Sequence, residues 1–351
     1  MAGKRRGNGE GSIVRKPTGQ WMAAMTSGRD PATGKLKRTY FYGKTRAEVS
    51  AKLAHAQSDK ARGTFVEPHK VIVAQWLETW LEDYARPKVR QTTLDSYEGL
   101  IRRHLIPALG RTPLQSLRPD MVQHVYNTKH SDGLSPGTIG MMHMVLSAAM
   151  KQAVRVGLVM RNPCEATTLP RVTTRTMHPL TLEEVRRLLS ATKQDRLFPA
   201  MFLEFGTGLR RGEILAARWS DVDLDTGVLH VRQALSRVMN RGNGTRKTHL
   251  QFHEPKTDSS RRTIPIPSDI IEELRHHKSR QAQERLLFGQ AYQDHGLVFC
   301  EPDGRPIDPR TFTRRFDALL KQAGLPHFNF HSARHAYATI ALELGESAKV
   351  V

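Results

Sequence analysis

Several features that define other classes of protein are scarce in this sequence of 351 residues. It contains only two cysteines, Cys164 and Cys300, too few for a disulfide framework or a cysteine-rich zinc site, so we expect two buried thiols and a reducing compartment. No apolar run approaches the roughly 20 residues that span a bilayer, and the N-terminal residues lack the apolar stretch of a signal peptide. The sequence therefore predicts a cytoplasmic protein with no membrane partner.

Acidic residues are also scarce relative to basic ones. The chain has 34 Asp plus Glu against 54 Lys plus Arg, a net charge of +20, and its 38% of hydrophobic residues suffice for real cores. Residues 1–70 hold 15 basic and 5 acidic residues, so +10, half of the excess, lies in one fifth of the chain. This balance indicates a polyanionic partner, and nucleic acid, whose phosphates release counterions on binding, fits better than an acidic membrane.

The N-terminal part is predicted to form a small α+β domain over residues 1–66. Alternating apolar residues and glycine- or proline-rich turns indicate three short strands and a helix, at residues 12–16, 20–26, 37–42 and 46–60. Basic and aromatic side chains of this sheet could enter a DNA groove, namely Arg15, Lys16, Trp21, Lys37, Arg38 and Tyr40. The alternative is a solvated sheet whose aromatic residues form its core.

An all-α domain of four helices is predicted over residues 70–165. Amphipathic apolar stripes indicate helices at about 73–84, 93–107, 119–129 and 136–153. The fourth is introduced by Ser135 as N-cap and Pro136 at its first position. Its methionines are expected to fill gaps in the core, namely Met141, Met142, Met144 and Met150.

A third domain, over residues 176–351, follows an extended basic linker. Thr181 and Glu184 form a capping box at the start of its first helix. Strand-like segments at 228–233 and 262–266 interrupt a mostly helical pattern, and residues 237–247 are predicted to form a solvated loop. The fold class predicted for the whole chain is multidomain, with a three-stranded sheet plus helix, a four-helix domain, and a mainly α domain with a small β-sheet.

The motif Thr-Gly-Leu-Arg-Arg-Gly-Glu, at residues 207–213, places a glycine turn directly before a helix. Arg210 then lies in the first helical turn, where its guanidinium and free backbone N–H groups could together hold a phosphate. In the alternative interpretation, Arg210 pairs with Glu213 at i, i+3 on an exposed helix. The spacing of this motif does not distinguish the two.

Two further motifs carry basic residues suited to chemistry. Lys256 precedes a predicted strand, so its ammonium could reach a leaving oxygen, although a lone surface lysine is the simpler interpretation. His331, Arg334 and His335 share one helix face, nearly opposite the apolar one. The two histidines have the i, i+4 spacing of a zinc pair, but position 332 is serine and no cysteine or acidic third ligand stands nearby, so no metal is expected.

Taken together, Arg210, Lys256, His331 and Arg334 suit phosphoryl transfer without a metal or cofactor. Two guanidinium groups can stabilise the charge on a pentacovalent phosphorus while an ammonium protonates a departing 5′-oxygen. This set lacks a nucleophile.

In their order and separations, these motifs resemble those of the tyrosine recombinases, specifically the three-domain integrases of phages and mobile elements. The resemblance covers essentially the whole chain and implies an arm-type DNA-binding domain, a core-binding domain and a catalytic domain. It implies that Arg210 and Arg334 clamp the scissile phosphate, that Lys256 is the general acid and that His331 assists proton transfer. Glu213 would orient the first arginine. The implied partners are double-stranded attachment-site DNA, a homotetramer on that DNA, and accessory DNA-bending or excision factors.

In that family a tyrosine attacks the phosphate and is held as a 3′-phosphotyrosine. The family pattern continues after His-x-x-Arg with a Leu-Gly-His-like motif and then the tyrosine, whereas this sequence ends at Val351, and none of its seven tyrosines is a convincing substitute. We therefore expect a recombinase whose nucleophile segment is missing from these 351 residues and which forms no covalent DNA adduct.

Two other functions are compatible with parts of the pattern. A decayed or regulatory relative would occupy DNA sites without cutting them. A metal-dependent nuclease is disfavoured, because the sequence lacks the acidic cluster that a two-metal site needs.

Overall fold

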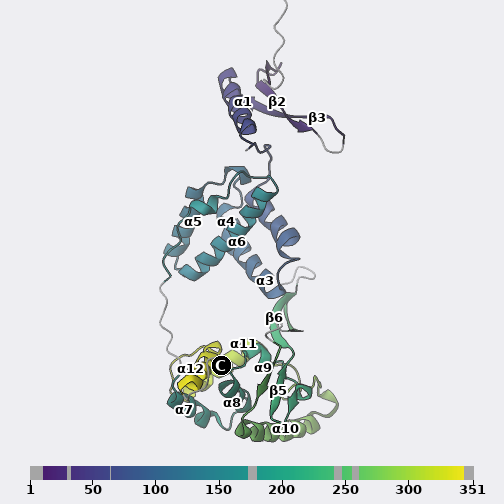
Figure 1. The fold of residues 1–351 in the computed structure, drawn as a ribbon, viewed down its shortest axis with the longest axis vertical. Coiled ribbons are helices and arrows are strands. Elements are labelled where there is room, and N and C mark those ends of the chain that lie inside the picture. The colour runs from purple at the N-terminus through teal and green to yellow at the C-terminus, as the bar shows by residue number, and fades with distance from the viewer. Residues whose placement is uncertain are drawn as a thin grey trace, which may run out of the picture. The chain divides into compact units, whose positions relative to one another are not determined.

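The computed structural model describes residues 11–29, 33–63, 65–172, 180–240, 247–254 and 261–343, apart from the side chains of Lys247, His331, Ala341 and Glu343. The chain divides into two compact units, Met1–Thr173 and Thr174–Val351. Figure 1 shows their elements, and each unit is described by itself. Among the described residues, no helix has the length and apolar character needed to cross a membrane.

The first unit begins with the predicted three-stranded sheet and helix. The sheet is antiparallel in the order β1-β2-β3, with strands β1 (Ser12–Arg15), β2 (Trp21–Arg29) and β3 (Leu36–Gly43). Helix α1 (Arg46–Ala61) is capped by the Thr45 side chain and lies along the sheet (Figure 1). A small core joins the two, in which Ala23 and Met25 of β2 pack with Val49 and Leu53 of α1.

The rest of the first unit is helical, as the apolar stripes predict. Its elements are α2 (Val73–Thr79), the π-helical η1 (Trp80–Ala85), α3 (Gln91–Leu100), the π-helical η2 (Ile101–Leu105), α4 (Ile106–Leu109), the 3₁₀ turn η3 (Leu114–Ser116), α5 (Pro119–Ser131), α6 (Pro136–Arg155) and the 3₁₀ turn η4 (Pro163–Ala166). Because α2 and η1 are continuous, and α3, η2 and α4 likewise, the unit contains the four predicted helical segments. Ser135 caps α6 by accepting a hydrogen bond from the Thr138 N–H.

The core of these helices confirms part of the methionine prediction and corrects the rest. Met142 and Met150 are fully buried, but Met141 is 43% exposed and Met144 46% exposed. Successive residues of an α-helix are about 100° apart, so Met141 and Met144 fall outside the stripe that faces the core. Cys164 is buried as expected, and burial raises the pKa of its thiol to about 12.

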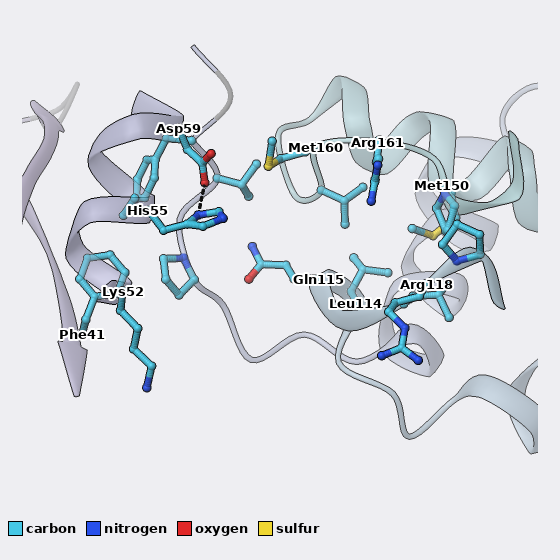
Figure 2. Close-up of a pocket in the computed structure, with 18 of the residues that line it drawn as sticks. Phe41, Lys52, His55, Asp59, Leu114, Gln115, Arg118, Met150, Met160 and Arg161 are labelled. Carbon is cyan, nitrogen blue, oxygen red and sulfur yellow. Dashed lines mark ion pairs between the residues drawn. The ribbon is translucent and has the colours of Figure 1, made fainter. Parts of the chain in front are cut away.

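The first unit also contains a hollow of about 670 Å³. Figure 2 shows Lys52, His55 and Asp59 of α1 on one side of it, with His55 Nδ1 2.8 Å from Asp59 Oδ2. Leu114 and Arg161 line the other side. None of the three sequence motifs contributes to its lining, so this hollow is separate from the candidate chemistry.

The second unit is mainly α with two small pieces of sheet. Its elements are α7 (Leu182–Thr192), α8 (Phe198–Thr207), α9 (Arg211–Ile214), the 3₁₀ turn η5 (Trp219–Asp221), β4 (Val222–Asp223), β5 (Val228–Val231), β6 (Ala234–Asn240), β7 (Lys247–His253), β8 (Arg262–Pro265), α10 (Ser268–Phe288), the 3₁₀ turn η7 (Gly289–Ala291), α11 (Pro309–Gln322) and α12 (Phe330–Glu343). One sheet has the order β4-β5-β8, and β6 pairs with β7. The predicted capping box of Thr181 and Glu184 opens α7.

Strands β6 and β7 correct the prediction of a solvated loop at 237–247 for residues 237–240 and 247, while 241–246 lie outside the described residues. The strands are antiparallel from Ala234 opposite His253 to Asn240 opposite Lys247. Leu235 is 3% exposed, so the hairpin rests on the core. At these strand residues the loop prediction was wrong, because it was based on the glycine, asparagine and basic content of the segment and missed the apolar residues that anchor the start of β6.

Candidate active site

The first motif is held between α8 and α9 by a left-handed turn. Thr207 ends α8, and Gly208 follows with φ +60°, a conformation that glycine adopts without strain. A Cβ at Gly208 would lie 2.6 Å from Cδ1 of Tyr337, so the ring of Tyr337 packs closely on this turn. The turn delivers Arg210 to the N-cap position of α9.

Arg210 and Glu213 are joined by two hydrogen bonds. The Arg210 backbone N–H donates to Glu213 Oε2 at 3.0 Å, and Arg210 Nη1 donates to Glu213 Oε1 at 2.8 Å. The i, i+3 pair of the alternative interpretation therefore exists. The Arg210 side chain is nevertheless 47% exposed while that of Glu213 is 4% exposed, so the pair holds a guanidinium at the surface against a buried carboxylate. Helix α9 has only four residues, and the Arg210 backbone N–H already donates to Glu213. The Arg210 backbone N–H is therefore not free to hold a phosphate as the sequence predicted.

A second arginine, which sequence reasoning missed, binds the same carboxylate. Arg262, the first residue of β8, donates from Nη1 to Glu213 Oε1 at 3.2 Å and from Nη2 to Glu213 Oε2 at 2.9 Å. Both oxygens of Glu213 thus accept two hydrogen bonds, one from each arginine. The available sequence signal was the arginine pair that opens the predicted strand, but nothing in the sequence says that this strand end meets α9.

The ionisation of Glu213 reflects these bonds. Burial by itself would raise the pKa of Glu213, but the hydrogen bonds from Arg262 and Arg210 outweigh it, and the pKa is lowered. Glu213 is therefore an anion across the neutral pH range, as a carboxylate between two guanidinium groups should be.

Arg334 of α12 joins this cluster. Its Nη1 donates to the Gly208 carbonyl oxygen at 2.8 Å, which ties α12 to the turn before Arg210. The pKa of Arg334 is lowered by burial and by the positive charges of Arg210 and Arg262. The structure thus brings three guanidinium groups together beside the Glu213 carboxylate, and their positive charges reinforce one another at this end of the unit.

Glu204 is a second buried carboxyl beneath this cluster. It lies on α8, is 1% exposed, and its Oε2 has no hydrogen-bond partner in the described part of the chain. Burial, followed by the nearby Glu213 carboxylate, raises the pKa of Glu204 well above its ordinary value, against the opposing effect of Arg334. The pKa values of the two carboxyls therefore shift in opposite directions, because hydrogen bonds from two arginines hold Glu213 and burial dominates at Glu204.

Two of the predicted catalytic residues are not placed by the structure. Lys256 lies outside the described residues, between β7 and β8. His331 lies in the first turn of α12, three residues before Arg334, but its side chain is not described. In the described ranges, no group of three or more potential ligands is arranged to hold a metal ion.

The predicted DNA-binding residues of the N-terminal sheet divide between its two faces. Arg38 and Tyr40 are two residues apart on β3, so both lie on the face away from α1, and both are exposed. Lys16 lies near them, with its Nζ 4.7 Å from the centre of the Tyr42 ring. On the other face Trp21 packs against the core that includes α1.

Two other residues of the predicted set lie at the margins of this sheet. Arg15 is exposed at the end of β1, opposite Trp21. Lys37 forms an ion pair of 2.5 Å with Glu67. A basic and aromatic outer face therefore remains, smaller than the set that the sequence indicated.

None of the seven tyrosines is paired with the arginine cluster by a described hydrogen bond. Tyr126 is buried among the helices of the first unit, and Tyr292 lies with its hydroxyl 3.6 Å from Cys300 Sγ. Tyr337 is half-buried and contributes its ring to the packing on Gly208.

Comparisons with known proteins agree with this architecture. Residues 178–351 match the sequence pattern of the phage integrase family, and residues 72–130 match the N-terminal SAM-like domain of phage integrases. A XerC-like tyrosine recombinase of Caldanaerobacter subterraneus is 33% identical over 345 residues, which covers 94% of this chain and 87% of the relative. An integrase of Saccharopolyspora erythraea is 26% identical over 99% of this chain and 90% of its own length.

Solved structures show the same fold. The Tn1549 transposon integrase, in complex with transposon right end DNA, superposes with a TM-score of 0.68 at 23% identity, covering 80% of this chain and 89% of that one. A lambda integrase dimer bound to a COC′ core site gives a TM-score of 0.56 at 20% identity, covering 99% and 90%. The fold is thus that of a multidomain integrase. With the sequence matches, this shows that the chain belongs to the phage integrase family of tyrosine recombinases.

Proposed function

We propose that this chain carries the DNA-binding parts and the phosphate-binding arginines of a site-specific DNA recombinase of the integrase type, whose reaction passes through a 3′-phosphotyrosine intermediate. The observation that carries the proposal is the convergence of Arg210 and Arg334 beside the buried Glu213 carboxylate. Guanidinium groups at the end of an apolar core are suited to bind a phosphodiester and to stabilise the extra charge of its transition state.

The remaining steps are assigned to residues by the family motif. A tyrosine oxygen attacks phosphorus and the bond to the 5′-oxygen breaks, with Lys256 supplying the proton to that oxygen and His331 assisting the transfer. The reverse attack by a 5′-hydroxyl rejoins the strand without an external energy source. Glu213 acts through Arg210, which it holds in place.

We do not assign the nucleophile to any of the seven tyrosines of these 351 residues. The tyrosine nearest the arginines in the sequence, Tyr337, uses its ring to pack on Gly208. The proposal for the 351-residue chain alone is therefore DNA binding without cleavage.

The three parts of the chain take the roles of the three-domain integrases in this proposal. Residues 1–66 form an arm-type DNA-binding domain, 70–165 a core-binding domain and 176–351 the catalytic domain. Solved relatives include the Tn1549 integrase bound to transposon DNA and a lambda integrase tetramer bound to a Holliday junction. Double-stranded attachment-site DNA and a homotetramer on it are the proposed partners, and accessory DNA-bending or excision factors would act on the same complex.

The first test of this function examines whether Arg210 and Arg334 contact the same backbone phosphate. A preferred site is selected from random duplex DNA with the purified chain, and single neutral methylphosphonates are then placed along its backbone in turn. At one position per strand we expect neutralisation to weaken binding by the unaltered chain. The same neutralisation should not weaken binding by the Arg210→Ala/Arg334→Ala variant, because that variant has already lost the arginines that would contact the phosphate. Arg305→Ala, an exposed arginine paired with Asp303, serves as control.

The same site, nicked beside that phosphate, tests the nucleophile. The 351-residue chain should bind it and leave no adduct that survives denaturation. If an adduct forms and is lost in Tyr337→Phe, the assignment of Tyr337 to packing alone is wrong. If no backbone position distinguishes the arginine variant from the parent, the proposed scissile-phosphate site is wrong.

A second prediction concerns the N-terminal sheet. Replacing Arg38 and Tyr40 by alanine removes a cation and an aromatic ring from the outer face without touching the core residues Ala23 and Met25. We expect weaker binding to long DNA that carries outlying sites and little change on a short core duplex, because two linked modules bind long DNA with a raised effective concentration. Electrophoretic mobility shifts with both lengths measure this, and Lys52→Ala on α1 is the control. Equal losses on both lengths would argue against a separate arm-binding module.

A further inference from the structure

A hollow of about 560 Å³ opens in the second unit beside the arginine cluster. Seven polar side chains line it, namely Arg218, His230, Arg232, Glu254, Arg261, Arg262 and Thr263. They come from the residue before η5, from β5 and the residue after it, from the residue after β7, and from the residue before β8 and the first two residues of β8. Segments separated in sequence therefore place four guanidinium groups around one opening.

A buried carboxylate anchors two of these arginines. Asp221 is 2% exposed, and its Oδ2 accepts a hydrogen bond of 3.0 Å from Arg218 Nε. Its Oδ1 lies 3.4 Å from Arg232 Nη1 and accepts no hydrogen bond from the described residues. The Arg218 and Arg232 side chains are 38% and 61% exposed. Asp221 thus positions two accessible guanidinium groups, as Glu213 positions Arg210 and Arg262.

The charge around the hollow favours an anion. Among the described residues, four arginines face three carboxylates, those of Asp221, Glu213 and Glu254, which leaves an excess of one positive charge before Arg210 and Arg334 are added. Asp221 and Glu213 are almost fully buried, whereas Glu254 is 76% exposed, lines the hollow and is paired with Arg261, so the other three arginines face the opening without an exposed acid beside them in the described residues. Arginine presents several N–H donors in a planar fork, a geometry that matches phosphate oxygens.

Arg262 connects this hollow to the catalytic cluster. The same side chain lines the hollow and donates two hydrogen bonds to Glu213, which in turn holds Arg210. An anion in the hollow would therefore be a close neighbour of a phosphate held by Arg210 and Arg334. A DNA strand supplies successive phosphates at such short spacing, whereas a single small anion would occupy only one of the two places.

We propose that the hollow formed by Arg218, Arg232, Arg261 and Arg262 binds a phosphodiester of the DNA backbone next to the scissile phosphate. This proposal rests on the proposed function, because it takes the scissile phosphate to lie at Arg210 and Arg334. The contact carries no base information and sets the register of the strand on the enzyme. Asp221 is a positioning residue in it.

The test uses the 351-residue chain with Arg218→Gln and Arg232→Gln combined. Loss of one phosphate contact should lower the slope of log affinity against log salt by about 1 and weaken binding at moderate salt by roughly fivefold to tenfold. Arg275→Gln is the matched control, since Arg275 is 56% exposed and paired with Asp225 outside the hollow. The combined Arg218→Lys and Arg232→Lys variant keeps both charges, so its slope should stay with the parent.

Methylphosphonate mapping identifies the ligand. We expect one backbone position, within one or two nucleotides of that detected by the Arg210 and Arg334 variants, where neutralisation weakens the parent but not the double glutamine variant. An unchanged salt slope, or a loss spread evenly over all positions, would overturn the proposal while leaving the proposed function intact. Failure of the parent to bind DNA would instead refute the proposed function. Unfolding midpoints of every variant separate a lost contact from a lost fold.

Discussion

Replacing Glu213 with alanine is expected to lower the free energy of unfolding of the second unit by roughly 3–5 kcal/mol, the typical cost of removing one partner from a buried ion pair. Glu213 accepts two hydrogen bonds from each of Arg210 and Arg262, counting the Arg210 backbone N–H. Its removal leaves two guanidinium groups close together and close to Arg334, so their repulsion adds to the lost hydrogen bonds. Denaturant unfolding followed by circular dichroism measures the loss.

A double-mutant cycle makes this prediction specific to the pair. If Glu213 acts on Arg262, the combined Glu213→Ala and Arg262→Ala variant should be more stable than the sum of the two single losses predicts, because the two single changes remove the same ion pair. Glu183→Ala, an exposed acid in the first turn of α7, should cost little. Strict additivity of the two losses would show that the pair is not coupled.

The pH dependence of the same variant has a defined sign. The folded-state pKa of Glu213 is lowered, so its stabilising contribution is present above the unfolded value of 4.5 and is lost as pH falls through the lower folded value. The unaltered protein should therefore lose stability in acid relative to neutral pH by more than Glu213→Ala does. Parallel acid limbs would show that Glu213 is not held as an anion.

The sequence was sufficient to single out Arg210 and Arg334 as a candidate pair. The glycine turn before Arg210 and the helical face that carries Arg334 both follow from local pattern, and the structure brings the two residues together. Arg262 could not be found in this way, because its role depends on the start of β8 meeting α9, a contact between segments 49 residues apart. Long-range pairing of this kind leaves no local periodicity to read.

The same limit explains the errors in the fold. The hairpin of β6 and β7 was missed because polar composition outweighed a short alternating pattern, and pairing between the strands supplied the stability that local propensity lacked. The methionines of α6 were judged by residue type, whereas the face on which each lies decided their burial. Glu204 had no sequence signal, since one acid within an apolar helix looks like a residue that turns to solvent.

The two buried carboxyls near the arginine cluster, Glu213 and Glu204, differ in what they contribute to its charge. Glu213 is ionised and anchors Arg210 and Arg262, while Glu204 has a raised pKa and adds no charge while it remains protonated. Under the proposed function this difference favours binding of a phosphodiester, because a second buried anion would offset the field of Arg334. Keeping the Glu204 carboxyl buried has a cost, which lowers the free energy of unfolding.

That cost leads to the second large prediction, for Glu204→Gln. The pKa of Glu204 is raised in the folded state, first by burial and then by Glu213, so its stability contribution is complete below the unfolded value of 4.5 and is lost as pH rises toward the folded value. Within that window each pH unit lowers the free energy of unfolding by up to about 1.4 kcal/mol. Glutamine is neutral at every pH and has nearly the same shape, so the variant should escape this loss.

The expected result is a pair of stability curves that meet near pH 4.5 and separate as pH rises, with Glu204→Gln the more stable at neutral pH. Denaturant unfolding at half-unit pH steps measures the separation, and Glu183→Gln on the exposed face of α7 should follow the parent. Glu204→Leu, which removes the polar oxygens altogether, should be at least as stable as the parent at neutral pH if Oε2 has no partner. Curves for Glu204→Gln and the parent that stay parallel would mean that Glu204 is ionised throughout, with Arg334 and Arg211 as its counter-ions, and that the arginine cluster carries a second buried anion.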